Sequence, residues 1–326
     1  MKRLIPFVLL TVALAVLAAG CGSKKKAAGS TTAASPTTTV TSSFKVGLST
    51  DTGGLNDRSF NHLAYVGLQR AASELGVQTR VVTSKAPSDY IPNLTALAKQ
   101  GFNLVIGVGF TEIDAVKTVA QAFPKTHFAI VDVSNADEGN LKNVEGLLFK
   151  EQEAGYLAGY AAGLAAQARG GTAVSSVGGQ KQPPVDRYIA GYQAGAKAAF
   201  PAVKLINGYS QDFSNQAKCK EVALNQIAGG SVVVFQVAGG CGLGALDAAK
   251  GTGIWGVGVD ADQSYLGTYV LTSALKRVDT NQALQVGSKQ LLASATKGVD
   301  VSVVDVVGQL VDGKFKGGTD LVLGIS

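Results

Sequence analysis

The sequence predicts an α/β protein built from parallel β-sheets, and three observations carry this prediction. Short apolar runs suited to buried strands alternate along the chain with amphipathic stretches of helical period. The body of the chain, from Phe44 to Ser326, is long enough for one large domain or two of ordinary size. The whole chain is 46% hydrophobic and 16% charged, which is typical of sheets covered on both faces.

The predicted strands are apolar runs that recur between the predicted helices. The runs are residues 45–48, 104–108, 128–131, 232–235 and 254–259. Helical periodicity is found at residues 61–74, 90–100 and 113–123. Ligands of parallel sheets bind beyond the carboxyl ends of the strands, so the polar residues that follow each run are the candidates for a site.

Residues 1–20 have the layout of a secretory signal peptide. Lys2 and Arg3 precede an apolar run, residues 4–19, that is shorter than the ~20 residues needed to span a bilayer. The small residues before Cys21 resemble the lipobox of bacterial lipoproteins, which implies that the Cys21 sulfur is acylated and that the mature chain begins there. The alternative is plain secretion with an unmodified Cys21.

Residues 21–43 predict a lipid-anchored flexible tether. They are rich in Lys, Ala, Ser and Thr and contain no apolar run that could join a core, so we expect disorder. The chain has 29 basic and 23 acidic residues, but five of the basic residues precede Phe44. The body is therefore nearly neutral and lacks the basic excess expected of a nucleic-acid partner.

A glycine-containing loop leads from the first predicted strand into the first predicted helix. Asp57 or Ser59 could cap this helix, because either side chain can accept from its free N–H groups. Phe60 lies in the first helical turn, where it could stack on a planar ligand or pack into the core.

Asp51 followed by Asp57-Arg58-Ser59-Phe60-Asn61 resembles the signature of the basic-membrane-protein (PnrA-like) family of ABC transporter substrate-binding lipoproteins. Four further segments resemble motifs of this family and occur in the family's order. They are residues 178–196, 235–240, 258–263 and 271–277. Together the five motifs cover about residues 44 to 318 of the chain.

The resemblance implies a type I periplasmic-binding-protein fold, with two Rossmann-like lobes, a hinge and an interlobe cleft. The N-terminal lobe would comprise residues 44–145 plus about 264–298, and the C-terminal lobe residues 146–263 plus about 299–326. Lobes that close around a solute would present a shape for ABC permease subunits to recognise. We expect a monomer, anchored by lipid on the extracytoplasmic face of the cell membrane.

The family usually continues past the position of Gly324 with a glycine-rich segment that completes the second lobe. This chain stops at Ser326. Either its terminus is naturally short or the sequence is a fragment.

The resemblance also implies that the cleft binds a nucleoside, with a purine as the expected base. The implied contacts are two aromatic faces for the base, polar groups around the base, and a set of residues for the ribose. They are, in that order, Phe60 and Phe235; Asp51, Asn61 and Asp132; and Asp260, Asp262, Lys276 and the backbone at Gly240. A carboxylate that accepts from vicinal hydroxyls makes charge-assisted bonds, which favour a ribose. Spacing leaves open which of Asp260 and Asp262 points into the cleft.

Other classes of function fit less well. A receptor for another small polar solute, such as a sugar, is the main alternative. The loop of residues 51–57 is similar to the metal-binding loop of nucleoside hydrolases, but His62 and His127 form no evident acid/base cluster. Residues 239–244 lack the Gly-x-Gly-x-x-Gly spacing of a dinucleotide-binding motif. We therefore expect no catalytic residue, no metal and no cofactor. A sugar-sensing repressor conflicts with the secretion signal.

Cys219 and Cys241 form an even pair in a chain expected to reach an oxidising compartment. The first lies in a helical stretch before the predicted strand that ends at Phe235, and the second lies in the loop after it. Both a disulfide and two buried free thiols remain open.

Overall fold

The structure is a computed structural model that describes residues 43–263 and 291–325. The predicted signal peptide, Cys21, most of the predicted tether and Lys276 lie outside these residues. Within them, no helix is both long and apolar enough to cross a membrane. Helices and strands alternate as the sequence predicts, and the strands form two separate parallel sheets.

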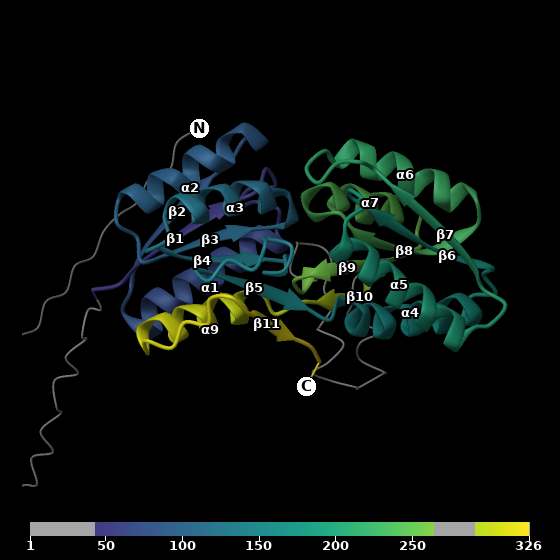
Figure 1. Ribbon diagram of the computed structural model, residues 1–326. Helices are drawn as coiled ribbons and strands as arrows, with labels where there is room; N and C mark the ends of the chain where they lie inside the picture. The colour runs from purple at the N-terminus through teal and green to yellow at the C-terminus, as the bar shows by residue number, and fades with distance from the viewer. Residues whose placement is uncertain (1–42, 264–290, 326) are drawn as a thin grey trace, which may run out of the picture. The chain divides into compact units, whose positions relative to one another are not determined.

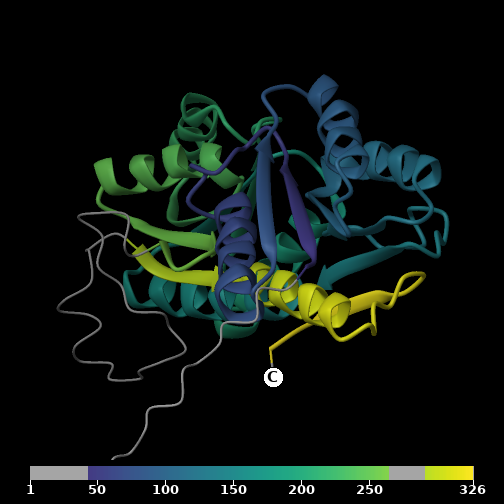
Figure 2. The same ribbon diagram turned by 90° about the vertical axis from the view of Figure 1, so that its left-hand side faces the viewer.

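The first sheet has six parallel strands in the order β11-β5-β4-β3-β1-β2. They are β1 (Lys45–Thr50), β2 (Gln78–Thr83), β3 (Leu104–Val108), β4 (His127–Val131), β5 (Val144–Phe149) and β11 (Asp320–Leu323). One face packs on α1 (Phe60–Leu75) and α9 (Val299–Val311), which lie side by side in Figures 1 and 2. The other face packs on α2 (Tyr90–Lys99) and α3 (Ile113–Ala122). Short 3-10 helices, η1 (Pro87–Asp89) and η2 (Phe110–Glu112), precede α2 and α3.

The second sheet has five parallel strands in the order β10-β9-β8-β6-β7. They are β6 (Ala173–Gly178), β7 (Lys204–Tyr209), β8 (Ser231–Val237), β9 (Trp255–Asp260) and β10 (Leu291–Thr296). Helices α4 (Glu151–Ala168) and α5 (Pro183–Ala199) cover one face. Helices α6 (Gln216–Ala228) and α7 (Gly239–Gly251) cover the other. Each sheet with its helices forms one lobe.

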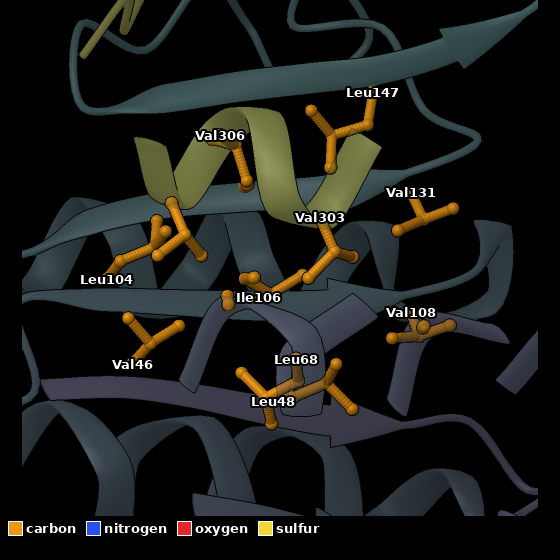
Figure 3. Packing of buried hydrophobic residues seen from close by; sticks show 14 of the residues in the cluster. Val46, Leu48, Leu68, Leu104, Ile106, Val108, Val131, Leu147, Val303 and Val306 are labelled. Atoms are coloured by element: carbon orange, nitrogen blue, oxygen red, sulfur yellow. The ribbon is translucent and has the colours of Figure 1, made fainter. Parts of the chain in front are cut away.

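The core of the first lobe joins strands to both helices on one face of the sheet (Figure 3). Val46 of β1 and Ile106 of β3 are fully buried against Leu68 of α1 and Val303 of α9. Burying a side chain of this size contributes ~1.5–3 kcal/mol. The apolar stripe of α9 is therefore part of the first lobe, although α9 follows the second sheet in sequence.

Helices α4 and α5 pack at unusually short range because glycines face backbone across their contact. A Cβ on Gly159 would lie 1.9 Å from the Tyr192 carbonyl oxygen, and one on Gly195 would lie 2.0 Å from that of Tyr156. No side chain fits there. This contact fixes α5, which carries Tyr188 to the site.

The predicted division of the C-terminal part between the lobes is wrong for the described residues. Strand β10 pairs with β9 in the second sheet, whereas α9 packs on α1 and β11 pairs with β5 in the first. β5 also extends the first lobe to Phe149. The described chain crosses between the lobes at Lys150, before α4, and at Lys297-Gly298, before α9.

Candidate functional site

A pocket lies where the carboxyl ends of strands from the two lobes meet. The first lobe contributes Asp51, Gly53, Asp57, Phe60, Asn61, Gly109, Phe110 and Asp132; the second lobe and its crossing contribute Gln182, Pro184, Val185, Tyr188, Phe213, residues 237–240, Val259, Asp260 and Lys297. The cavity volume is about 60 Å³, below the ~300–1,000 Å³ of pockets that hold drug-sized ligands. The lobes therefore lie close together in this structure, and they must separate for a nucleoside-sized solute to enter.

Asp51, at the end of β1, organises the loop on the first-lobe side of the pocket. Its Oδ1 accepts from the Gly53 amide at 2.8 Å and from Asn61 Nδ2 at 2.7 Å. Burial raises the pKa of Asp51 to about 6, although the bonds from Asn61 and Gly53 lower it. Asn61 Nδ2 also donates to Asp57 Oδ2 at 3.0 Å, so both of its hydrogens are used within the loop, and Asp51 and Asn61 line the cavity side by side.

Asp57 caps α1. Its carboxylate accepts from the backbone amides of Ser59, Asn61 and His62 at 3.0, 2.7 and 3.1 Å. Of the two predicted caps, Asp57 fills the role, and the Ser59 side chain makes no capping bond. Burial raises the pKa of Asp57, against the effect of these three amides.

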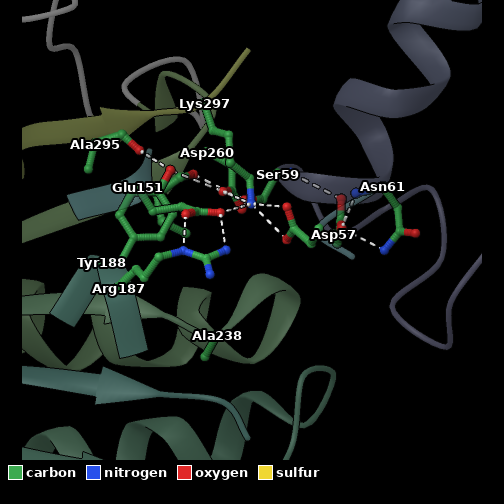
Figure 4. Close-up of polar contacts among 12 residues, drawn as sticks. Asp57, Ser59, Asn61, Glu151, Arg187, Tyr188, Ala238, Asp260, Ala295 and Lys297 are labelled. Carbon is green, nitrogen blue, oxygen red and sulfur yellow. Dashed lines mark hydrogen bonds and ion pairs between the residues drawn. The ribbon is translucent and has the colours of Figure 1, made fainter. Parts of the chain in front are cut away.

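Lys297 is the centre of a buried cluster of charges (Figure 4). Its Nζ lies 2.8 Å from both carboxylate oxygens of Asp132, 3.6 Å from Glu151 and 3.9 Å from Asp260. Only 4% of its side chain is exposed. Burial would lower the pKa of Lys297, but Asp132, Asp260 and Glu151 together raise it. The pKa of Asp132 rises to about 7, because burial outweighs the lowering effect of Lys297.

Strained backbone presents the two carboxylates that flank this lysine. Asp132 follows β4 and Asp260 ends β9, and their φ angles are +72° and +60°. A non-glycine residue in this left-handed region costs ~1–3 kcal/mol, and such strain clusters at functional sites. Both carboxylates point toward Lys297, which lines the same pocket.

Glu151 and Tyr188 support the cluster from the second lobe. Glu151 is fully buried and accepts from Arg187 Nε at 2.6 Å and from Nη2 at 3.4 Å. The Tyr188 hydroxyl donates to Asp260 Oδ1 at 3.4 Å and to the Ala295 carbonyl at 3.2 Å. Burial raises the pKa of Tyr188 well above its usual range, so this group stays a donor.

Six of the nine predicted ligand contacts line the pocket. They are Asp51, Phe60, Asn61, Asp132, Gly240 and Asp260. Of the two alternatives at the end of β9, the structure places Asp260 in the pocket wall and Asp262 outside it. Lys276 lies outside the described residues.

The prediction that Phe235 forms an aromatic face of the cleft is wrong. Phe235 is fully buried in the second-lobe core, with its ring centroid 6.1 Å from that of Tyr188 and 4.9 Å from that of Tyr192. It lies on a central strand whose face is covered by α4 and α5. Val237, two residues further along this face, reaches the pocket in its place.

Two residues that line the pocket, Phe213 and Lys297, were not among the contacts predicted from the sequence. Phe213 is a lone aromatic in the polar run that follows β7, at the edge of the sheet where ligands bind, and that placement could have identified it. Lys297 belongs to a near-repeat: residues 271–279 and 292–300 are identical at six of nine positions. The predicted Lys276 and the observed Lys297 occupy the same place in the two copies.

Cys219 of α6 and Cys241 of α7 form a disulfide, with their Cα atoms 5.5 Å apart. The Cys241 amide also donates to the Phe213 carbonyl at 2.9 Å. These contacts brace the turn that holds Gly239 and Gly240 in the pocket wall. In the described part of the chain, no three His, Cys, Asp or Glu side chains are grouped to hold a metal ion.

Two parallel α/β lobes around a pocket are the architecture of solved solute-binding proteins of ABC transporters. The chain is similar to the solved structure of an ABC transporter solute-binding protein from Aeropyrum pernix K1, with a TM-score of 0.74 and 28% identity, covering 86% of this chain and 74% of that one. A solute-binding protein from Conexibacter woesei DSM 14684 shares the fold at a TM-score of 0.61.

The chain belongs to the PnrA-like (Bmp) family of ABC transporter substrate-binding proteins, whose model matches residues 44–326. It is 34% identical over 330 residues to the ABC transporter nucleoside-binding protein BmpA of Lactococcus lactis subsp. cremoris, covering 98% of this chain and 87% of the relative. An uncharacterized lipoprotein of Pyrococcus horikoshii is 32% identical over 289 residues, covering 85% and 65%. The protein is thus a substrate-binding component of an ABC transporter, not an enzyme, and works with a small solute and membrane permease components.

Proposed function

We propose that the protein binds a nucleoside with a purine base between its lobes and delivers it to an ABC importer. One observation carries the proposal: the aromatic ring of Phe60 and the Asp260–Lys297 pair line the same pocket. Phe60 offers a face for a base, and stacking contributes ~1–3 kcal/mol per base. Asp260 and Lys297 offer an acceptor and a donor for vicinal ribose hydroxyls.

The charge of the pocket supports an uncharged, hydroxyl-rich solute. Four aspartates, Asp51, Asp57, Asp132 and Asp260, line the cavity with one lysine, Lys297. Carboxylates accept from hydroxyls and from amino or imino groups of a base. They repel a phosphate, so a nucleoside fits this wall better than a nucleotide.

The name of the Lactococcus lactis relative, a nucleoside-binding protein, supports the same class of solute. The second aromatic face is assigned to Phe213, which lines the pocket from the second lobe. Phe60 and Phe213 would thus contribute one ring from each lobe, so that stacking is completed by closure.

Calorimetric titration of the full-length protein tests the proposal. Guanosine and inosine are expected to release or absorb heat on binding, and guanine and ribose to bind far more weakly, since each carries half of the contacts. Phe60→Ala should weaken guanosine binding about tenfold or more. Tyr160→Ala, an exposed aromatic of α4 outside the pocket, is the control. Ribose binding as tight as guanosine would replace the proposal with a sugar receptor.

We also propose that Cys21 carries the lipid anchor and that the protein acts as a monomer on the extracytoplasmic face of the membrane. The lipobox-like residues before Cys21 support the lipid anchor, as does the lipoprotein name of the Pyrococcus horikoshii relative. Mass spectrometry of the membrane fraction should find an acylated Cys21. Cys21→Ser should move the protein to the soluble fraction, and its retention in the membrane would contradict the anchor.

A further inference from the structure

Ser59 occupies the N-cap position of α1, but its hydroxyl serves no residue of its own lobe in the contacts described. The Asp57 carboxylate already accepts from the amides of Ser59, Asn61 and His62, so the cap is complete without the serine side chain. The sequence alone permitted either residue to cap. In the structure Asp57 caps α1, so the Ser59 hydroxyl is available for a contact outside the helix.

That hydroxyl reaches across to the second lobe. Ser59 Oγ lies 2.9 Å from Asp260 Oδ2 and 3.0 Å from the Val259 carbonyl oxygen, 201 and 200 residues away in sequence. Ser59 is fully buried, and its single hydroxyl hydrogen is shared between these two acceptors. Figure 4 shows the serine beside the aspartate.

The other oxygen of Asp260 faces different partners. Oδ1 accepts from the Tyr188 hydroxyl at 3.4 Å and lies 3.9 Å from Lys297 Nζ. Tyr188 belongs to the second lobe and Lys297 to the crossing, so these contacts do not require the lobes to meet. The bond from Ser59 does, because Ser59 and Asp260 approach each other only when the lobes are closed.

We propose that Ser59 is a positioning residue for solute capture: its hydroxyl latches the closed lobes and orients Asp260 without contacting the solute. Ser59 is not among the residues that line the cavity, whereas Asp260 is. A solute therefore need not displace the Ser59 hydroxyl in order to contact Asp260. The bond favours closure for any solute, so the inference rests on the two-lobed fold and not on the choice of a nucleoside.

Hydrogen bonds to charged groups are the stronger ones in folded proteins, so loss of this bond should shift the closed-to-open ratio by about tenfold or more. Single-molecule FRET can measure the ratio on the full-length protein without any solute. Dyes are attached through unnatural amino acids at Lys125, exposed before β4, and Ala202, exposed before β7. These positions lie at the outer ends of the two lobes, away from the strand ends that form the pocket.

Ser59→Ala is expected to move molecules from the high-FRET to the low-FRET population, with an unchanged melting temperature. Ser302→Ala is the matched control: Ser302 is also fully buried, but its hydroxyl donates to Val299 within α9. If Ser59→Ala does not fold, Ser59→Cys, which keeps the size and only a weak donor, replaces it. A Ser59 variant whose FRET distribution matches wild type and Ser302→Ala overturns the latch.

Adding guanosine separates this inference from the proposed function. If Ser59→Ala opens the lobes but the wild-type protein binds none of guanosine, inosine and adenosine, the latch stands and the nucleoside assignment falls. If guanosine binds and its dissociation rate is the same in wild type and in Ser59→Ala, the nucleoside assignment stands and the latch is contradicted. The expected result is an increase of about tenfold in the guanosine dissociation rate in Ser59→Ala.

Discussion

Lys297 Nζ lies 2.8 Å from both carboxylate oxygens of Asp132, although the two residues are 165 positions apart in sequence. Asp132 follows a strand of the first sheet, and Lys297 lies on the crossing that leaves the second sheet. Their ion pair joins the wall of the pocket to a segment that connects the lobes. Lys297 is therefore part of both the pocket wall and the crossing between the lobes.

Lys297→Met should destabilise the fold, because it leaves the buried carboxylates of Asp132, Asp260 and Glu151 without their shared cation. Breaking a buried ion pair costs about 3–5 kcal/mol. Denaturant unfolding at pH 7 measures the change, and Lys314→Met, at an exposed pair with Asp312, should be near neutral. Equal midpoints for the two variants would contradict the buried cluster.

Phe60→Ala and Phe235→Ala should have opposite consequences. Phe60 lines the pocket, so its loss should weaken solute binding with little change in stability. Phe235 is a fully buried core residue, and Phe→Ala in a core costs about 3–5 kcal/mol. Thermal unfolding and titration with guanosine separate the two effects. A Phe235→Ala protein with wild-type stability would contradict the core position of Phe235 and favour the stacking role that the sequence predicted.

The pKa of Asp51, raised by burial to about 6, predicts the sign of a pH effect. Between about pH 4 and pH 6 the folded chain holds a proton here that the unfolded chain has lost. The free energy of unfolding therefore falls as pH rises through this range, and the loss is complete above pH 6. Asp51→Asn should remove this slope and gain up to about 3 kcal/mol at pH 7.

Asp212→Asn is the control with the opposite sign. The amides of Asn215 and Ser214 and the side chain of Lys218 hold the pKa of Asp212 at about 2. Asp212 therefore stabilises the fold above about pH 4, and this contribution is lost as pH falls toward 2. Chemical denaturation from pH 3 to pH 8 measures both variants. If the unfolding free energy of Asp51→Asn falls with pH as steeply as that of the wild type, the pKa of Asp51 is not raised in the folded protein.

Gly159→Ala and Gly308→Ala should shift stability in opposite directions. A Cβ at Gly159 would lie 1.9 Å from the Tyr192 carbonyl oxygen, so α4 and α5 would have to separate. Overpacking of this kind typically costs about 1–3 kcal/mol. A Cβ at Gly308, inside α9, meets no heavy atom within 4 Å, and Ala should stabilise that helix by about 1 kcal/mol. Melting temperatures check both signs, and a tolerated Gly159→Ala would contradict the backbone contact.

Reduction of the Cys219–Cys241 disulfide should lower stability by about 3 kcal/mol, the value expected for a loop of this length. Alkylation of the denatured protein should modify neither cysteine without reductant and both with it. Two alkyl groups added before reduction would contradict the bridge. Because Cys241 braces the turn of Gly240, reduction should also weaken solute binding.

The sequence predicted the alternation of strands and helices but missed the strands at the edges of the sheets and two interior strands, β5 and β6. The buried runs that form β3, β4 and β8 were correct because both of their faces are covered. Strands β2 and β7 lie at sheet edges and are mostly exposed or half-buried, so they show no apolar run. Edge strands depend on their neighbours for their conformation.

The sequence motifs located the site correctly, but they did not identify every side chain that faces it. The polar residues at strand ends, such as Asp51 and Asp260, were found because parallel strands gather them at one edge. The sequence could not show that Phe235 faces the core, since that depends on which face of β8 the helices cover. The near-repeat in residues 271–300 gives Lys276 and Lys297 equivalent places in the sequence, and of the two only Lys297 belongs to the described residues, where it lines the pocket.

A crystal structure of the protein grown with guanosine tests the central claim most directly. We predict the purine between Phe60 and Phe213, and the ribose hydroxyls within hydrogen-bond distance of the Asp260 carboxylate and Lys297 Nζ. Guanosine bound elsewhere, or held in the cleft with its sugar turned away from Asp260 and Lys297, would contradict the account.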